Sequence, residues 1–406
     1  MPRASFLLRW MLCLACLTGL AGLSTRVTAQ VAVTEAVDYT FGGQVNFHLS
    51  FPAETPIKSA QVFLRNLGEA VTLSGDMTVS ATDALYVHDL TSQALRAFST
   101  VEYWFHITPA GGEPYYTEPQ TFLYFDNRFE WQTLEDEQFR VHWYAGDAAF
   151  GQSLMDAAHA GLEHAGKLVQ LGEGQPVDIY VYASGKDLQS TLRLGGLNWV
   201  AGHADPDMNL MAVSLPEGPD QKSETERQIP HELMHILLYQ AVGDDYENLP
   251  TWFKEGMASA NELRPNSDYY LILEQAVEQE ALIPLAQLCA SFPKDSNAYT
   301  AYAEADSFVR YLYQKYGAAG LSALLQGYAS GGGCEYGSQA ALGLPLERLE
   351  KDWRREALGE SVWLSALGNL LPWLFLMLAV ILAPLLLTIF NARKKAVKKE
   401  TRVTYG

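Results

Sequence analysis

Apolar and polar residues alternate with a period of two along residues 30–126, the pattern of half-buried β-strands. The clearest runs are 45–51, 60–64, 101–107 and a last run near 121–125. Turn-forming residues such as those at 109–112 separate these runs. Short strands between such turns predict a β-sandwich domain over 30–126.

The pattern changes after residue 126. Residues 126–137 show no clear periodicity, and we interpret them as a connection between domains. Alternation at 139–144 and an apolar run at 177–182 predict strands, whereas 149–170 and most of 222–357 are helix-like. Strands followed by helices indicate an α+β domain, which we place over 127–360.

The N-terminus has the pattern of a secretory signal peptide over residues 1–29. A basic start precedes an apolar run from Trp10 to Leu23, and small residues precede a cleavage site after Ala29. One alternative is an uncleaved anchor helix, although this apolar run is short for a bilayer span. A lipid anchor on Cys16 is a poorer fit because it would truncate the apolar run.

The C-terminus predicts a transmembrane helix over 366–391. No charged residue lies between Glu360 and Arg393, and roughly 20 apolar residues span a bilayer. The alternative is a buried core helix. The basic tail at 392–406 is typical of the cytoplasmic side. We therefore expect a single-pass cell-membrane protein with its ectodomain outside the cytoplasm and the tail inside.

Charge and cysteine usage agree with an exported domain. The formal net charge is −19 although both ends are basic, so the central domains are acidic and a nucleic-acid partner is not expected. Cys13 and Cys16 fall within the signal peptide, which leaves Cys289 and Cys334. Two cysteines in an exported domain predict a disulfide, and the alternative is a pair of free thiols.

The strongest chemical feature is His231-Glu232-Leu-Met-His235 on a predicted helix. Histidines four residues apart stand above one another on a helix, so both imidazoles can bind one metal ion, usually Zn²⁺. Glu232 can then face the reacting water as a general base. Downstream, Pro250 opens a further predicted helix that carries Glu255, a candidate third ligand.

His231-Glu-x-x-His235 followed by Trp252-Phe-x-Glu255-Gly-x-Ala258 resembles the gluzincin metallopeptidases, which include the thermolysin and aminopeptidase N groups. The likeness is closest to bacterial exported proteins with a peptidase MA-like domain, and it covers about 130–358. It implies zinc bound by His231, His235 and Glu255, with Glu232 as the catalytic glutamate. The domain at 30–126 is similar in architecture to fibronectin type III or immunoglobulin-like modules.

The sequence departs from these families in two places. It lacks the Gly-x-Met-Glu-Asn motif by which aminopeptidases bind a free amino terminus, and Gly195-Gly-Leu-Asn-Trp199 stands upstream instead. Cleavage within a chain is therefore favoured. The thermolysin-type sequence around the third ligand is also absent. Glu262 is a candidate to orient a histidine, and the alternative is a solvated charge at a helix end.

The resemblance also implies the chemistry. Zinc activates a water molecule, Glu232 moves its proton, and a tyrosine from a later helix stabilises the oxyanion. Tyr302 is our candidate for that tyrosine, and the alternative is a packed aromatic. Residues 209–213, or those around His203, are candidates for an edge strand that pairs with an extended peptide.

These features predict a membrane-anchored, extracytoplasmic zinc endopeptidase that acts on a peptide or protein substrate. The alternative is a catalytically inactive, peptidase-like binding or scaffold protein of the cell envelope. We interpret His142, His159 and His164 as structural or surface residues.

Overall fold

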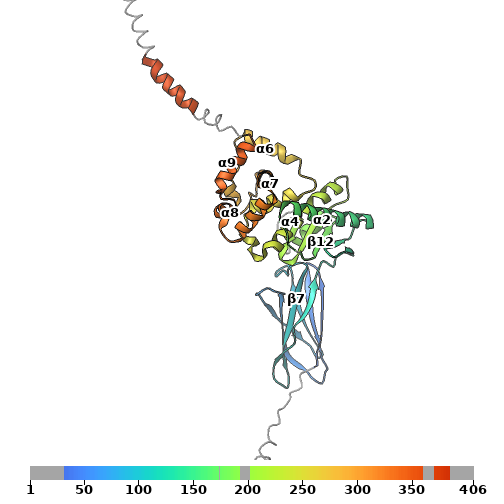
Figure 1. Ribbon diagram of the computed structural model, residues 1–406. Coiled ribbons are helices and arrows are strands. Elements are labelled where there is room, and N and C mark those ends of the chain that lie inside the picture. The colour runs from blue at the N-terminus through green and yellow to red at the C-terminus, as the bar shows by residue number, and fades with distance from the viewer. Residues whose placement is uncertain (1–31, 173, 193–201, 360–369, 385–406) are drawn as a thin grey trace, which may run out of the picture. The chain divides into compact units, whose positions relative to one another are not determined.

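The computed structural model describes residues 32–172, 174–192, 202–359 and 370–384 (Figure 1). The chain divides into two compact units, which are Met1–Trp131 with Ser184–Val200, and Gln132–Ala183 with Ala201–Gly406. The predicted signal peptide, the basic tail and the segment 195–199 lie outside the described residues.

The first unit contains two antiparallel sheets that share one apolar core. The strand order is β1-β2-β6-β5 in one sheet and β4-β3-β7-β8 in the other, where β9 also pairs with β7. Val45 and Phe47 of the first sheet, and Val62 and Phe105 of the second, belong to the same buried cluster. The predicted alternation is therefore confirmed, because every second residue of these strands faces the shared core. The strands are β1 (Thr34–Thr40), β2 (Gln44–Ser50), β3 (Ile57–Asn66), β4 (Leu73–Asp76), β5 (Thr78–Val79), β6 (Asp83–Asp89), β7 (Ser99–Pro109), β8 (Tyr115–Tyr116) and β9 (Gln120–Tyr124). The short helix α3 (Gly185–Leu192) also belongs to this unit.

The second unit is built on a five-stranded sheet with the order β10-β11-β12-β14-β13. The three central strands run parallel, and each outer strand pairs antiparallel with its neighbour. The strands are β10 (Gln132–Glu135), β11 (Phe139–Trp143), β12 (Val177–Tyr182), β13 (Gly202–Asp205) and β14 (Leu210–Ser214).

Two expectations about this sheet need correction. The segment 126–137 is more than a connection, because it contains β10. With Leu134 as its one apolar residue, β10 is too short for an alternating pattern to show. Of the two candidate edge strands, the one around His203 is the edge, as β13. Residues 209–213 fall mostly in β14, which lies between β12 and β13 and is buried throughout.

Helices cover the sheet and continue into a helical region (Figure 1). Helices α2 and α4 pack on each other, and their apolar residues, such as Leu154 and Leu233, join those of the sheet in one buried cluster. Gly161 permits a close crossing, because a β-carbon there would lie 3.0 Å from Pro230 of α4. The helices are α2 (Ala148–Leu168), α4 (Gln221–Val242), α5 (Thr251–Asn261), α6 (Asp268–Glu278), α7 (Ala298–Ala329), α8 (Gly333–Leu342) and α9 (Leu346–Glu356), with 3₁₀ turns η2 (Pro206–Met208), η3 (Gly243–Asn248) and η4 (Leu285–Leu288).

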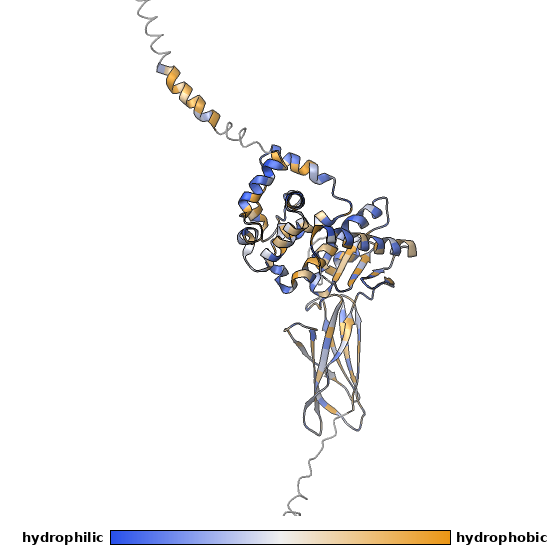
Figure 2. Cartoon of the chain, viewed as in Figure 1, coloured by the Kyte–Doolittle hydropathy of each residue, from blue (hydrophilic) through white to orange (hydrophobic). Residues whose placement is uncertain are grey.

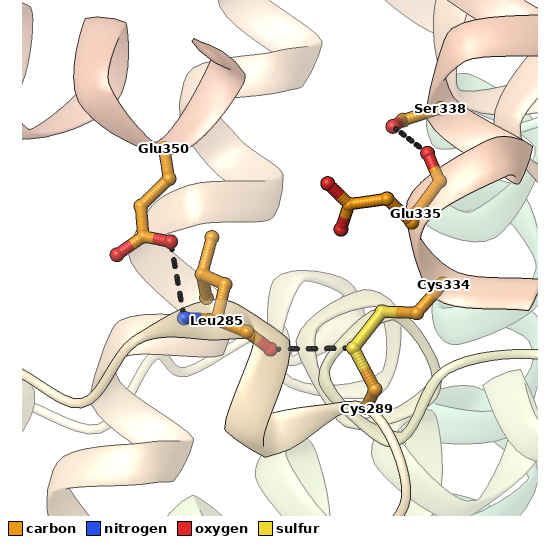
Figure 3. Close-up of a disulfide and its surroundings, with 6 residues drawn as sticks. All are labelled: Leu285, Cys289, Cys334, Glu335, Ser338 and Glu350. Carbon is orange, nitrogen blue, oxygen red and sulfur yellow. Dashed lines mark hydrogen bonds between the residues drawn. A yellow bond between two sulfur atoms is a disulfide. The ribbon is translucent and has the colours of Figure 1, made fainter. Parts of the chain in front are cut away.

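Cys289 and Cys334 form a disulfide, as predicted (Figure 3). It joins the residue after η4 to the first turn of α8. Leu285 at the start of η4 donates its N–H to Glu350 of α9. The bridge and this hydrogen bond hold the irregular segment between α6 and α7 against α8 and α9.

Residues 370–384 form a helix that is hydrophobic over most of its length (Figure 2). Its apolar side chains, such as Trp373 and Phe375, are exposed. The rest of the predicted membrane segment, 366–391, lies outside the described residues. Among the residues that the structure describes, no helix has both the length and the apolar character that crossing a bilayer requires.

Candidate metal centre

Helix α4 presents His231 and His235 on one face, one turn apart. Their ring centroids are 5.4 Å apart, and the rings meet edge to face. The opposite side of the helix is fixed by buried apolar residues such as Leu233 and Ile236. The predicted pairing of the two imidazoles therefore follows from helix geometry and from the core.

Helix α5 brings Glu255 to the same point. Its Oε2 atom lies 3.6 Å from Nε2 of His231 and 3.8 Å from Nε2 of His235. One ligand atom from each of the three residues lies within 4.8 Å of the other two. Gly256 allows this placement, because a β-carbon there would come within 2.5 Å of the carbonyl oxygen of Ala305 on α7. Glu255 thus supplies a candidate ligand, and Gly256 next to it allows α5 to pack closely against α7.

Glu262 orients His231. Its Oε1 atom is 3.0 Å from Nδ1 of His231, and its side chain is 1% exposed. The structure thus favours the orienting role over a solvated charge at a helix end. Pro230 helps to place Glu262 beside His231. A proline within α4 has no N–H, so the carbonyl of Glu226 lacks its usual partner inside the helix. That carbonyl accepts the N–H of Leu263 instead, which ties the end of α5 to α4.

His235 is oriented by Tyr246, a residue that the sequence analysis did not single out. The Tyr246 hydroxyl is 3.0 Å from Nδ1 of His235. Tyr246 lies in η3, between the two helices that carry the three candidate ligands. With both Nδ1 atoms engaged, both Nε2 atoms are left to face Glu255.

Glu232 and Tyr302, the two predicted catalytic residues, also reach this site. A β-carbon on Gly202 of β13 would lie 2.5 Å from Oε1 of Glu232, so the carboxylate lies directly against the edge strand. Tyr302 of α7 lies close enough to the carboxylates for them to act on it, because burial together with the charges of Glu255 and Glu232 raises the pKa of its hydroxyl. Its ring also packs edge to face on Phe292, with centroids 4.9 Å apart. Tyr302 is therefore a packed aromatic whose hydroxyl faces the cluster.

Burial and mutual charge shift the pKa values of these side chains. Burial raises the pKa of Glu232. Burial also acts to raise the pKa of Glu255, but the two histidines outweigh it and hold that pKa below its ordinary value. Burial lowers the pKa of His235. Burial acts in the same direction on His231, but the neighbouring carboxylates of Glu255 and Glu262 outweigh it and raise that pKa.

This donor set fits a zinc ion. Two imidazole nitrogens and one carboxylate oxygen converge, and the far nitrogen of each histidine already has a hydrogen-bond partner. Zinc sites in enzymes use three such protein ligands and leave one position open for water or substrate. Partners on the far nitrogen fix which tautomer is present and where the ring points.

The three histidines that we interpreted as structural or surface residues make contacts away from this cluster. His142 lies between Thr133 and Asp178, His159 contacts Asp136 at 2.6 Å, and His164 contacts the carbonyl of Asn261 at 3.1 Å.

Residues 157–359, about half of the chain, match the family profile described as Peptidase MA superfamily. No curated protein matches the chain. Among solved structures, an aminopeptidase N family protein from Idiomarina loihiensis is 10% identical, with 80% of this chain and 70% of that chain covered and a TM-score of 0.33. The bromine derivative of BhCBM56 is 20% identical over 23% of this chain and 95% of that chain, with a TM-score of 0.19.

Proposed function

The chain belongs to the Peptidase MA superfamily, and from that membership we propose that it is a zinc-dependent endopeptidase, anchored in the cell membrane with its catalytic domain outside the cytoplasm. The observation that carries the proposal is the convergence of His231, His235 and Glu255 on one point beside Glu232. A protein that only stored or sensed a metal would not need Glu232, because that carboxylate is not one of the three converging ligands.

Each side chain has a defined task in this proposal. His231, His235 and Glu255 would hold the metal. Bound zinc would supply Lewis-acid activation of a water molecule and of the scissile carbonyl. Glu232 takes the proton of the attacking water and later delivers it to the leaving amine. Tyr302 donates its hydroxyl proton in a hydrogen bond to the carbonyl oxygen as negative charge develops there.

The edge strand supports an extended peptide as substrate. In the described part of the sheet, β13 is the terminal strand, and Gly202 brings it against Glu232. A peptide that pairs with such an edge lays its main chain along the site, whatever its side chains. The sequence has no Gly-x-Met-Glu-Asn motif to hold a free amino terminus, so we propose cleavage within a chain.

Membrane anchoring rests on the chain ends. The helix at 370–384 exposes apolar side chains, and a strongly basic segment follows it. The predicted signal peptide would direct the central domains out of the cytoplasm. A protease added to intact cells should then digest the domains at 30–126 and 127–360 and spare the C-terminal tail at 392–406. Full protection of both domains would contradict this topology.

The direct test uses the full-length chain purified in detergent. We expect stoichiometric zinc and cleavage of peptides from a mixed library, with cleavage abolished by a chelator and restored by zinc. Glu232→Gln should keep the zinc and lose hydrolysis, and Glu255→Ala should lose zinc.

The outcomes separate the candidate functions. Zinc without cleavage of any peptide would favour the inactive binding protein. A folded chain that takes up no zinc would overturn the proposal. Unchanged hydrolysis by Glu232→Gln would remove Glu232 from its role as the base.

A further inference from the structure

We propose that Tyr246 is a positioning residue for the metal, because its hydroxyl holds the His235 ring with Nε2 turned toward Glu255. The inference rests on the proposed function only in taking zinc as the occupant of the three-residue cluster. It does not require that the protein hydrolyse peptides.

The geometry at His235 carries the inference. Nδ1 of His235 lies 3.0 Å from the Tyr246 hydroxyl, while Nε2 lies 3.8 Å from Oε2 of Glu255. A neutral imidazole that binds a metal through Nε2 carries its proton on Nδ1, so this N–H donates to the phenol oxygen. Both residues are 8% exposed. Bulk water therefore has little access to replace the hydroxyl.

Tyr246 is itself held on several sides. The ammonium of Lys254 lies 4.7 Å from the centroid of its ring, and the ring of Tyr239 meets it edge to face at 6.0 Å. Its carbonyl accepts the N–H of Leu249, which closes the turn before α5. Lys254 precedes Glu255 on α5, so the contact also links Tyr246 to the helix of the third ligand.

The two histidines have different partners, one charged and one neutral. The carboxylates already present around the histidine pair explain why the second partner is neutral. His231 bonds to the carboxylate of Glu262, whereas His235 bonds to a neutral phenol. Glu232, Glu255 and Glu262 already place three carboxylates around the histidine pair. A further buried carboxylate at position 246 would add like-charge repulsion, whereas a phenol orients the ring without added charge.

The test compares two Tyr→Phe variants of the full-length protein. Tyr246→Phe removes the hydroxyl that contacts His235. Tyr239→Phe is the matched control, because its ring packs on the same tyrosine while its hydroxyl donates to Asp244 at 3.0 Å. The readout is the zinc dissociation constant, measured by competition with a chromophoric chelator. We expect Tyr246→Phe to weaken zinc binding by about 10- to 100-fold and Tyr239→Phe to leave it near the wild-type value.

A second readout separates positioning from general stability. Cobalt(II) at saturating concentration should give a visible absorption spectrum that differs between Tyr246→Phe and wild type, because the spectrum depends on ligand geometry. The spectrum of Tyr239→Phe should match wild type. Thermal unfolding of each metal-free chain shows whether the variant is folded at the temperature of these measurements.

Each outcome decides the inference. Wild-type zinc affinity and cobalt spectrum in Tyr246→Phe would overturn it. Equal weakening in both variants would also overturn it, since the effect would then not depend on the hydroxyl that contacts His235. Suppose that Tyr246→Phe alone weakens zinc binding and that the wild type cleaves no peptide. This result would support the inference while the peptidase proposal failed. A wild-type protein that binds no zinc would overturn both.

Discussion

Gly202 of β13 lies so close to Glu232 of α4 that a β-carbon at position 202 would come within 2.5 Å of the carboxylate oxygen Oε1. Real β-carbons essentially never make a contact that short. The edge strand can therefore come this close to the proposed general base because residue 202 is a glycine and has no β-carbon. In the proposed function, the same approach would bring the main chain of a peptide paired with β13 next to that base.

Gly202→Ala should lower peptide hydrolysis without loss of zinc. The contacting atom is the end of a flexible side chain, so the Glu232 carboxylate moves and the backbone keeps its course. A displacement of about 1 Å at a catalytic group costs up to about 100-fold in rate. The check is kcat on a cleaved peptide together with zinc affinity. Gly218→Ala, where nothing lies within 4 Å of the added carbon, is the control. Wild-type kcat in Gly202→Ala would show that the strand does not set the position of Glu232.

Tyr302→Phe should retain zinc and reduce kcat. The Tyr302 hydroxyl lies within the electrostatic influence of Glu255 and Glu232, whose charges add to burial in raising its pKa, and it is the proposed donor to the developing oxyanion. Loss of one such donor costs about 100- to 1,000-fold in kcat. Tyr299 on the same helix is 61% exposed, so Tyr299→Phe controls for the loss of a hydroxyl from α7. A rise in KM with unchanged kcat would assign Tyr302 to substrate binding alone.

The part of the site that the sequence predicts best is the part that local geometry determines. His231 and His235 share a helix face whenever the segment is helical, and 177–182 is a strand because its alternate residues are fully apolar. The helix that carries both histidines begins at Gln221. Its apolar periodicity becomes visible only from Ile229, because the first turns carry mostly polar residues.

Tyr246 and β10 are two features that the sequence alone does not predict. The contact between Tyr246 and His235 depends on the path of the 3₁₀ turn η3, for which residue spacing gives no rule. β10 is a strand only because β11 offers it a partner. Both features arise from tertiary placement. The two candidate edge strands, in contrast, do differ in composition. β14 is mostly apolar and buried throughout, whereas β13 contains His203 and Asp205 and is only partly buried.

Reduction of the Cys289–Cys334 disulfide should destabilise the second unit. The bridge closes a loop between residues 45 positions apart, and the chain-entropy estimate for such a loop is about 4 kcal/mol. The carbonyl of Cys289 accepts the N–H of Thr251 at 2.8 Å, at the start of the helix that carries Glu255. We therefore also expect weaker zinc binding after reduction.

Urea unfolding of the full-length chain, with and without reductant, measures this effect. The Cys289→Ser, Cys334→Ser double variant is the control, and its unfolding curve should not respond to reductant. Identical curves for the oxidised and reduced wild type would contradict a stabilising role for the bridge.

Glu304 should make the protein less stable as the pH rises toward 8. It lies on α7 with no exposed surface, its Oε1 accepts the N–H of Ile283 at 2.8 Å, and its Oε2 is buried without a partner in the described structure. Burial raises its pKa to about 8, partly opposed by the Ile283 hydrogen bond and Arg354, while Glu350 raises the pKa further. In the unfolded chain the pKa returns to its ordinary value of 4.5.

The sign of the effect follows from proton binding. Between pH 4.5 and about 8 the folded protein keeps a proton on Glu304 that the unfolded chain has released. The resulting stability is complete below pH 4.5 and is lost as the pH rises through about 8, with a total on the order of a few kcal/mol. Glu304→Gln keeps an acceptor for Ile283 and cannot titrate. The free energy of unfolding of the wild type, measured relative to this variant from pH 5 to about 8.5, should therefore fall with increasing pH. A constant difference across that range would show that Glu304 has an ordinary pKa in the folded protein.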